Sequence, residues 1–445
     1  MSSTSTDGGS AATVREQGRP APARLRRLVR TGRSASGAVV AQLAQAAASL
    51  VLQVVALRAL GAEGLAVFAL VYSGLVLVTA LSSGLVGDSL TVLDRRDPRV
   101  RSGLLVVALV VAVGSAALTV LVVRPAGLLE PGPAIVAAAA VLLFLLEDLG
   151  RRWLMAALLF WRVVAVDAAS LVVAVAWLVV RSEDLVMADL FAALALGQLS
   201  GLLVALLCLP RHERSGPLAW RTADVAGVLR FGAWRAAQQA VRPGTLMLVR
   251  VLVVAALGTA AVGQLEAARL YAAPAMLVLA GAASFLFASY ASRRSVGLDR
   301  LLAAADRGAA ALVLSALGAG AVAVLLVPSV GPLLTASQFS LDVAAVAGWC
   351  LYAAASASLT PYASLAAVRG RHVAVLVLRL GEMLLTLGAV AVLLFAVGVG
   401  AAWMPLALVG GAVGSAVVAR QRLLLPLVAA QRREAAEQTS RGAVG

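Results

Sequence analysis

Three charged side chains lie in the otherwise apolar stretch 245–274: Arg250, Glu266 and Arg269. A charge inside hydrocarbon is costly unless it is paired or faces a water-filled cavity. Arg269 follows Glu266 by three residues, which predicts a local ion pair on one helix face. Arg250 has no acid within four residues. Its guanidinium, which offers forked donors to phosphate oxygens, is therefore predicted either to bind an anionic ligand or to pair with a distant acid.

A second polar face lies on the apolar segment 38–59. Gln42, Gln45, Ser49 and Gln53 follow spacings of three, four and four residues, so they line one helix face. The tripeptide Ala-Leu-Gly ends this segment at 59–61 and recurs 197 residues later at 256–258. The same offset aligns three of the glutamines with later polar residues, and the predicted substrate-binding set is Gln42, Gln45, Gln53, Gln239, Arg242 and Arg250.

The composition places these residues in a membrane protein. Hydrophobic residues make up 61% of the 445-residue chain, charged residues make up 13%, and the mean hydropathy is +0.95. Uninterrupted Ala/Leu/Val runs, each long enough to cross a hydrocarbon layer of ~30 Å, predict helices rather than barrel strands. Twelve spans are expected, near 38–59, 65–86, 103–123, 134–159, 163–180, 185–209, 236–257, 262–289, 308–329, 343–366, 373–398 and 402–424.

The distribution of positive charge predicts the orientation. All 37 basic residues are Arg, and most lie in alternate loops, including 87–102, 210–235 and 290–307. By the positive-inside rule these loops and both termini are cytoplasmic. The use of Arg in place of Lys and the high Ala content indicate a high-GC bacterium, so the expected location is a bacterial cytoplasmic (plasma) membrane. The net charge of +15 is thereby assigned to orientation and to contacts with membrane lipids, and no motif for binding nucleic acid accompanies it.

The repeat divides the chain into two lobes. Six spans separate its two copies, so both enter the membrane in the same direction, as in a parallel repeat. The expected fold is an all-α polytopic membrane protein with twelve transmembrane helices in two six-helix lobes. The expected domains are a disordered basic cytoplasmic tail (1–35), an N-terminal lobe (36–215), a C-terminal lobe (216–427) and a second cytoplasmic tail (428–445).

Motifs for catalysis are missing from the sequence. It holds no phosphate-binding Gly-x-x-x-x-Gly-Lys-Ser/Thr loop, no Gly-x-Ser-x-Gly elbow and no His-Glu-x-x-His pair, so we expect no enzyme and no cofactor. His212 and His372 stand apart in predicted loops, so no metal site is expected. The segment "EDLGRR" (147–152) places two acids four residues before two arginines, which predicts ion pairs at a helix end.

The turn "RALGAEGLAVFAL" (58–70) resembles the turn between the first two helices of polysaccharide-biosynthesis flippases. These proteins form a family in the multidrug/oligosaccharidyl-lipid/polysaccharide exporter (MOP) superfamily. Leu60, Gly61, Glu63, Ala69 and Leu70 match the family pattern. Three positions depart from it, with Ala62 for Pro, Ala66 for Gly and Phe68 for Tyr. "LGTAAVGQLEAARLYAAP" (257–274) is similar to the equivalent turn of the second half.

The resemblance implies two lobes around a central cavity that opens alternately to the two sides of the membrane. It also implies a substrate such as a polyprenyl-pyrophosphate-linked glycan or a related anionic lipid, supplied by glycan-synthesis machinery. Arg242 and Arg250 would then bind the pyrophosphate, and Gln42, Gln45 and Gln53 would bind sugar hydroxyls.

Two alternative functions remain open. The first is a cation-coupled multidrug extruder of the same superfamily, for which Asp167 is the candidate coupling residue, although pairing with another helix would also explain this acid. Asp189 lies near the outer end of its span, where we expect it to be solvated. The second is a non-transporting membrane scaffold in envelope assembly, in which the cavity is inert.

Overall fold

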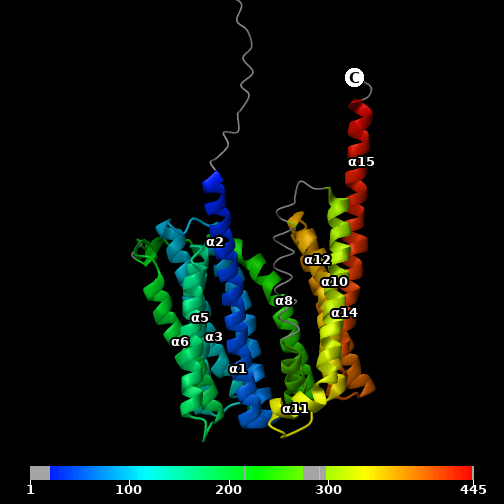
Figure 1. Cartoon of the computed structure of the whole chain (residues 1–445). Coiled ribbons are helices and arrows are strands. Elements are labelled where there is room, and N and C mark those ends of the chain that lie inside the picture. The colour runs from blue at the N-terminus through cyan, green and yellow to red at the C-terminus, as the bar shows by residue number, and fades with distance from the viewer. Residues whose placement is uncertain (1–20, 215–216, 274–289, 291–296, 443–445) are drawn as a thin grey trace, which may run out of the picture.

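The computed structural model describes residues 21–214, 217–273, 290 and 297–442 (Figure 1). Every secondary-structure element in these ranges is a helix, and they contain no strand. Helix α1 begins at Ala21, within the stretch where the composition predicts a disordered tail, while residues 1–20 lie outside the described part. The predicted lobe boundary at 215/216 also lies outside it and stays a prediction.

Ten helices in the described ranges are long and apolar enough to span a membrane. The first, Ala44–Val92, holds two predicted spans, and the predicted span 262–289 is described only as far as residue 273. Large apolar side chains on these helices are exposed, among them Leu121 (69%) and Val180 (78%). Exposed apolar residues on helices of this length face hydrocarbon, so the chain is a multi-pass membrane protein.

The first group of helices forms one side of the molecule (Figure 1). Helix starts follow local sequence signals: Pro98 occupies the first turn of α3, and the Asp97 carboxylate before it accepts a hydrogen bond from the Arg99 backbone N–H at 2.8 Å. The elements are α1 (Ala21–Ser82), η1 (Ser83–Gly87), α2 (Asp88–Val92), α3 (Pro98–Val123), α4 (Pro131–Ala156), α5 (Phe160–Val180) and α6 (Met187–Cys208).

The second group forms the other side, and α8 lies between the two groups (Figure 1). The chain reaches it through two short helices, α7 (Arg211–Arg214) and η2 (Trp220–Thr222). A helix described over 259–273 follows α8. The remaining elements are α8 (Val225–Leu257), α10 (Leu298–Leu325), α11 (Val327–Thr335), α12 (Val343–Val368), α13 (His372–Ala391), η3 (Val392–Val397), η4 (Ala401–Trp403), α14 (Met404–Val418), η5 (Ala419–Leu424) and α15 (Leu425–Gly442).

The two Ala-Leu-Gly tripeptides adopt the same backbone conformation. Gly61 has φ 69° and ψ −165°, and Gly258 has φ 84° and ψ 176°. A positive φ is accessible to glycine at little cost, so each glycine ends one membrane helix and lets the next begin. The repeat predicted at an offset of 197 residues is therefore present in the structure as a pair of equivalent turns.

The lobes contact each other beside these turns. A Cβ placed on Gly263 would overlap the Ala62 carbonyl, so the second helix of the C-terminal lobe approaches the Gly61 turn of the N-terminal lobe closely. Gln338 Nε2 donates to the Arg58 carbonyl at 2.7 Å. The largest apolar core cluster includes residues of both lobes, for example Leu57 and Val253. The end of the bundle that carries Gly61 and α11 is therefore packed across the lobe boundary.

The opposite end carries the start of α1 and the end of α15 (Figure 1). There the Glu213 carboxylate of α7 accepts a hydrogen bond from the Trp153 indole N–H at 2.8 Å and pairs with Arg95 at 3.3 Å. Burial raises the pKa of the Glu213 carboxyl, whereas the Trp153 hydrogen bond and the Arg95 charge lower the pKa. The lowering is larger, so the pKa of Glu213 lies below its ordinary value. An ionised Glu213 thus ties the loop between α6 and α8 to α4.

Candidate functional site

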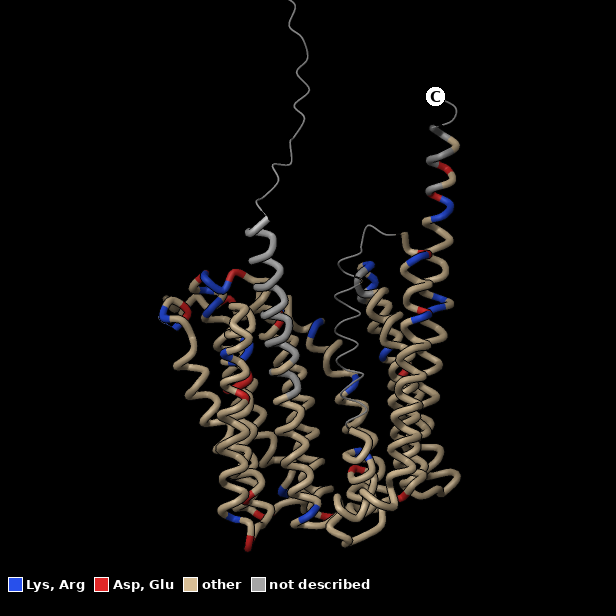
Figure 2. The backbone as a smooth tube through the Cα atoms, in the orientation of Figure 1, with Lys and Arg blue, Asp and Glu red and all other residues tan. Residues whose placement is uncertain are grey.

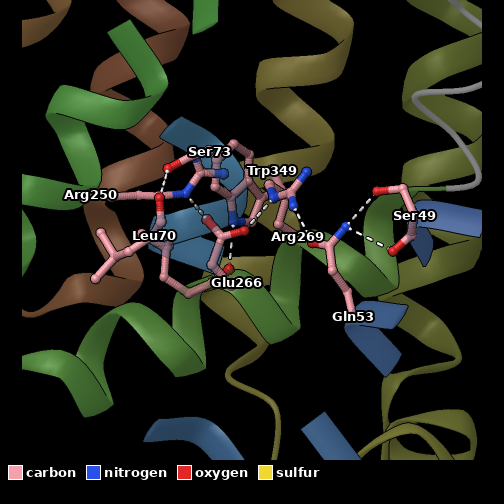
Figure 3. Close-up of polar contacts among 9 residues, drawn as sticks. Ser49, Gln53, Leu70, Ser73, Arg250, Glu266, Arg269 and Trp349 are labelled. Atoms are coloured by element: carbon pink, nitrogen blue, oxygen red, sulfur yellow. Dashed lines mark hydrogen bonds and ion pairs between the residues drawn. The ribbon is translucent and has the colours of Figure 1, made fainter. Parts of the chain in front are cut away.

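Arg250 on α8 has an acidic partner within the protein. Its Nε lies 2.8 Å from Oε1 of Glu266, 16 residues along the chain (Figure 3). Both residues are buried, with Arg250 7% and Glu266 1% exposed. Of the two alternatives, the structure has the distant acid as the partner of Arg250, and a role of Arg250 in substrate binding stays a prediction. Local sequence spacing could not find the pair because the turn at Gly258 separates its members.

The same carboxylate holds a second arginine. Arg269 Nε lies 2.6 Å from Glu266 Oε2, which confirms the predicted local ion pair. Arg269 Nη2 also donates to Gln53 Oε1 at 2.7 Å, and Gln53 Nε2 donates to Ser49 Oγ at 2.9 Å (Figure 3). Gln53 therefore joins α1 to the second lobe, and in this conformation its amide is occupied by protein partners rather than open to sugar hydroxyls.

These four residues form what we call the interface cluster: Gln53, Arg250, Glu266 and Arg269. Two guanidiniums share one carboxylate, so the cluster carries one excess positive charge. Trp349 covers it from α12, with its indole N–H donating to the Leu265 carbonyl at 3.0 Å (Figure 3). Buried charges persist only with well-aligned partners, and here each bond to Glu266 is 2.8 Å or shorter. The ion pairs lie within the C-terminal lobe, and the Arg269–Gln53 hydrogen bond links them to the N-terminal lobe.

Arg242 lies eight residues before Arg250 and in different surroundings. Its side chain borders a small cavity of about 20 Å³ between α8, α12 and α13, together with Tyr352, Arg379 and Glu382, and its guanidinium hydrogen-bonds to Tyr352. Arg379 and Glu382, three residues apart on one helix face, pair at 2.9 Å, so the carboxylate that lines this cavity already has an arginine partner. The two arginines predicted to act together therefore lie in separate places.

The remaining predicted glutamines are also dispersed. Gln239 Nε2 donates to Asp88 Oδ2 at 3.0 Å, and Arg235 pairs with the same carboxylate at 3.1 Å. Gln45 lines a cavity inside the N-terminal lobe. The side chain of Gln42 lies outside the described part of the chain. In this conformation the structure therefore does not gather the six predicted residues around one cavity.

A second group of charges lies inside the N-terminal lobe, and we call it the N-lobe cluster: Glu147, Asp148, Arg151, Arg152 and Asp167. Arg151 Nε lies 2.7 Å from Asp167 Oδ1, which joins α4 to α5. Arg152 Nε lies 2.6 Å from Asp148 Oδ2, and Arg151 lies 3.7 Å from Glu147. The predicted ion pairs within "EDLGRR" are confirmed, and Asp167 is paired with another helix.

The N-lobe cluster borders a cavity of about 40 Å³ whose lining is partly polar. Glu147 Oε1, Ser170 Oγ and Gln198 Oε1 are buried there and make no hydrogen bond to any residue that the structure describes. The cavity is large enough for water, and three carboxylates face only two guanidiniums. The surplus carboxyl group can accept a proton there. Sequence analysis missed Ser170 and Gln198, although Ser170 follows Asp167 by one helical turn.

Asp189 differs from its prediction. It is 6% exposed rather than solvated, and it lies 3.1 Å from Arg181. Its other oxygen accepts from the Val186 backbone N–H at 3.1 Å, which caps the start of α6. Asp189 therefore has a structural role at the helix end. Figure 2 shows that most charged residues lie at the two ends of the bundle and that only a few lie inside it.

Comparison with known proteins places the fold. No protein-family model matches the sequence, and no curated protein matches it. The inward-facing conformation of a multidrug resistance MATE family transporter of the MOP superfamily has a TM-score of 0.69 at 16% identity, covering 87% of this chain and 96% of that chain. The outward-facing conformation of such a transporter has a TM-score of 0.63 at 14% identity, covering 91% and 96%.

A third similar structure is a MOP superfamily transporter from Pyrococcus furiosus, for which a reverse polarity of the binding pocket suggests a different function. It has a TM-score of 0.63 at 14% identity, covering 91% of this chain and 96% of that chain. At 14–16% sequence identity, these structural similarities show only that the fold is shared. The fold class predicted from the sequence is confirmed: the chain has the fold of MOP superfamily transporters, with twelve transmembrane helices in two six-helix lobes.

Proposed function

We propose that the protein is an alternating-access transporter that moves a lipid-linked oligosaccharide or polysaccharide precursor across the cytoplasmic membrane. The fold supports transport, and the resemblance of the Gly61 turn supports the glycan-lipid substrate. The lobes contact each other at the Gly61 end, and the TM-score is higher for the inward-facing MATE structure (0.69) than for the outward-facing one (0.63). Both observations favour an inward-facing conformation of this chain.

The observation that carries the choice of substrate is Arg242 in the middle of α8, whose guanidinium hydrogen-bonds to Tyr352 and forms no ion pair with a carboxylate of the described residues. A phosphate-bearing substrate would be recognised by such a group, because a guanidinium matches phosphate oxygens with forked donors. A cationic drug would instead need an available carboxylate. Eight carboxylates of the described spans have an arginine nitrogen within 2.6–3.7 Å, namely Asp88, Glu147, Asp148, Asp167, Asp189, Glu266, Asp306 and Glu382. The acids of these spans without such a partner, Glu63, Asp299 and Glu434, are exposed.

The second candidate is a cation-coupled multidrug extruder. It is supported by the polar cavity beside Glu147, which has room for a cation or a proton, and by the description of similar structures as multidrug resistance transporters. Cation coupling is also compatible with a glycan-lipid substrate. The N-lobe cluster is therefore relevant to the ion that drives transport and does not distinguish between the two substrates. The substrate has to be tested separately.

The test uses the full chain in proteoliposomes, with a fluorescent polyprenyl-diphosphate glycan in one assay and a cationic dye in the other. We expect glycan-lipid translocation, and we expect Arg242→Ala to reduce it about tenfold or more, since a hydrogen bond to a charged group contributes about 1.5–3 kcal/mol. Arg242→Lys should restore part of it, because a lysine keeps the charge without the fork.

Arg124→Ala is the matched control, because Arg124 is an exposed arginine at the far end of α3. It should transport at the rate of the unaltered protein. Full translocation by Arg242→Ala would remove the anionic-substrate proposal. Dye efflux that is lost in Glu147→Gln, together with no glycan-lipid movement, would establish the extruder instead.

A further inference from the structure

A groove lies between α13 and the α14–η5 segment in the C-terminal lobe. It has a volume of about 590 Å³, much larger than the polar cavity of the N-terminal lobe. Its lining is apolar along most of its length and basic at two positions. The lining residues are Gly370, Arg371, Val373, Ala374, Val377, Leu378, Val418, Ala419, Arg422 and Leu423.

The two arginines lie at one end of the membrane-spanning bundle. Arg371 immediately precedes α13, and Arg422 lies in η5, near the end of the α14–η5 span. α12 and α14 run towards the end where α15 finishes, and α13 starts there, so both arginines lie at that end (Figure 1). The positive-inside rule predicts that this end is cytoplasmic, where anionic phospholipids attract basic side chains.

Neither of these guanidiniums has an acidic partner among the residues that the structure describes, and both side chains are exposed. Their neighbour Arg420 is different, because it binds both carboxylate oxygens of Asp306 at 2.8 and 3.0 Å. Asp306 therefore neutralises Arg420, two residues from Arg422, whereas the charges of Arg371 and Arg422 are available to bind an external anion. Buried Asp and Arg pairs elsewhere in the lobes show that such neutralisation is common in this protein.

The apolar part of the groove is continuous with a lipid-facing stripe. Val373, Val377, Leu380 and Leu384 follow helical spacings of four, three and four residues on α13, and all four are exposed. Large apolar side chains on one face of a membrane helix contact hydrocarbon. An acyl chain that lies along this stripe would place its headgroup at the level of Arg371 and Arg422.

We propose that the groove binds an anionic phospholipid, with its phosphate between Arg371 and Arg422 and an acyl chain along the apolar face of α13. Charge complementarity selects the anionic headgroup, because basic pockets between membrane helices on the cytoplasmic side bind such lipids. The apolar walls select a lipid over a soluble phosphate. The site is separate from the interface cluster and does not depend on which substrate is transported.

The experiment measures lipid binding by the purified, delipidated full chain. Dioleoyl phosphatidylglycerol and dioleoyl phosphatidylcholine are titrated in detergent, and bound lipid is counted by native mass spectrometry. We expect preferential binding of phosphatidylglycerol. The double variant Arg371→Gln/Arg422→Gln should bind it about 30-fold more weakly, since each arginine near an anionic headgroup contributes roughly 1 kcal/mol.

The matched control is Arg432→Gln/Arg433→Gln, which removes the same charge from exposed positions on α15 outside the groove. It should keep the binding of the unaltered protein. Arg371→Lys/Arg422→Lys should retain most of the affinity, because lysine supplies the charge. Val377→Trp fills the groove without changing a charge and should also weaken binding.

Three outcomes would overturn the proposal. One is equal binding of the two lipids by the unaltered protein. Another is full phosphatidylglycerol binding by the Gln double variant or by Val377→Trp. The third is displacement of phosphatidylglycerol from the groove by an equimolar polyprenyl diphosphate, which would assign the groove to the transported substrate. Because the assay needs no transport, failure of the proposed transport function would leave its result intact.

Discussion

The interface cluster and the N-lobe cluster both place arginines and carboxyl groups inside the bundle, but in opposite proportions. In the interface cluster one carboxylate, Glu266, pairs with two guanidiniums, and the Arg269–Gln53 hydrogen bond links the cluster to the N-terminal lobe. In the N-lobe cluster three carboxylates surround two guanidiniums within a single lobe, beside a cavity of about 40 Å³. The interface cluster has one more arginine than carboxyl groups, and the N-lobe cluster has one more carboxyl group than arginines.

This difference in composition and position indicates that the two clusters have different functions. A cluster that bridges the lobes must lose its Gln53–Arg269 bond whenever the lobes separate there, so its bonds help to determine which conformation is stable. A cluster with surplus acid next to a cavity can take up a proton or a cation without moving the lobes. The first is suited to holding a conformation and the second to binding an ion.

The largest effect is expected from removing the single acid of the interface cluster. Glu266→Gln leaves the buried guanidinium of Arg250 and the partly buried guanidinium of Arg269 without a carboxylate, which should lower the free energy of unfolding by about 3–5 kcal/mol. Membrane abundance and the thermal unfolding midpoint in detergent would show it. Glu382→Gln, at a more exposed pair, is the control and should lose far less. Equal midpoints for the two variants would contradict the interpretation of Glu266.

The next effect concerns the bond between the lobes. Gln53→Leu removes the acceptor of the Arg269 hydrogen bond, a contact to a charged group with an expected contribution of about 1.5–3 kcal/mol. The lobes should then separate more often at the Gly61 end. Spin labels at Ala59 and Ser340, with the native cysteines replaced, would report longer distances. Gln421→Leu is the same substitution away from the lobe interface and should leave the distances unchanged.

A smaller effect is expected at the wall of the N-lobe cavity. A methyl group on Gly201 would overlap Ser170 Oγ and come within 3.1 Å of the Glu147 side chain. Gly201→Ala should therefore destabilise the protein by about 1–3 kcal/mol, as overpacking does. Gly381→Ala meets no atom within 4 Å on α13 and should stabilise its helix by roughly 0.5–1 kcal/mol. Thermal unfolding of the two variants should shift in opposite directions.

The smallest effect on stability is expected from the same Glu→Gln change in the N-lobe cluster. Glu147 is 3% exposed, nearly as buried as Glu266, yet Glu147→Gln leaves two carboxylates with two guanidiniums. Stability should change by less than about 1 kcal/mol because no guanidinium loses its only partner. Transport, however, should no longer respond to an imposed proton or sodium gradient. A loss of stability comparable to that of Glu266→Gln would remove the contrast between the clusters.

The sequence by itself determined the membrane-spanning helices, the equivalent turns at Gly61 and Gly258, and the ion pairs between neighbours on one helix. Each of these follows from short-range physics. A run of about 20 apolar residues crosses the hydrocarbon layer as a helix, glycine permits the positive φ of the turns, and residues three or four apart share a helix face. Arg269–Glu266 and Arg379–Glu382 were predictable for this reason.

Only the tertiary structure decided the partners of Arg250, Asp167 and Gln53. Helical periodicity gives the face on which each residue lies, but not how each helix is rotated or which helix it packs against. Glu266 meets Arg250 across the Gly258 turn, Arg151 meets Asp167 across two helices, and Arg269 meets Gln53 across 216 residues. Because a buried charge must find a partner wherever the packing provides one, these contacts depend on the assembled lobes and not on spacing along the chain.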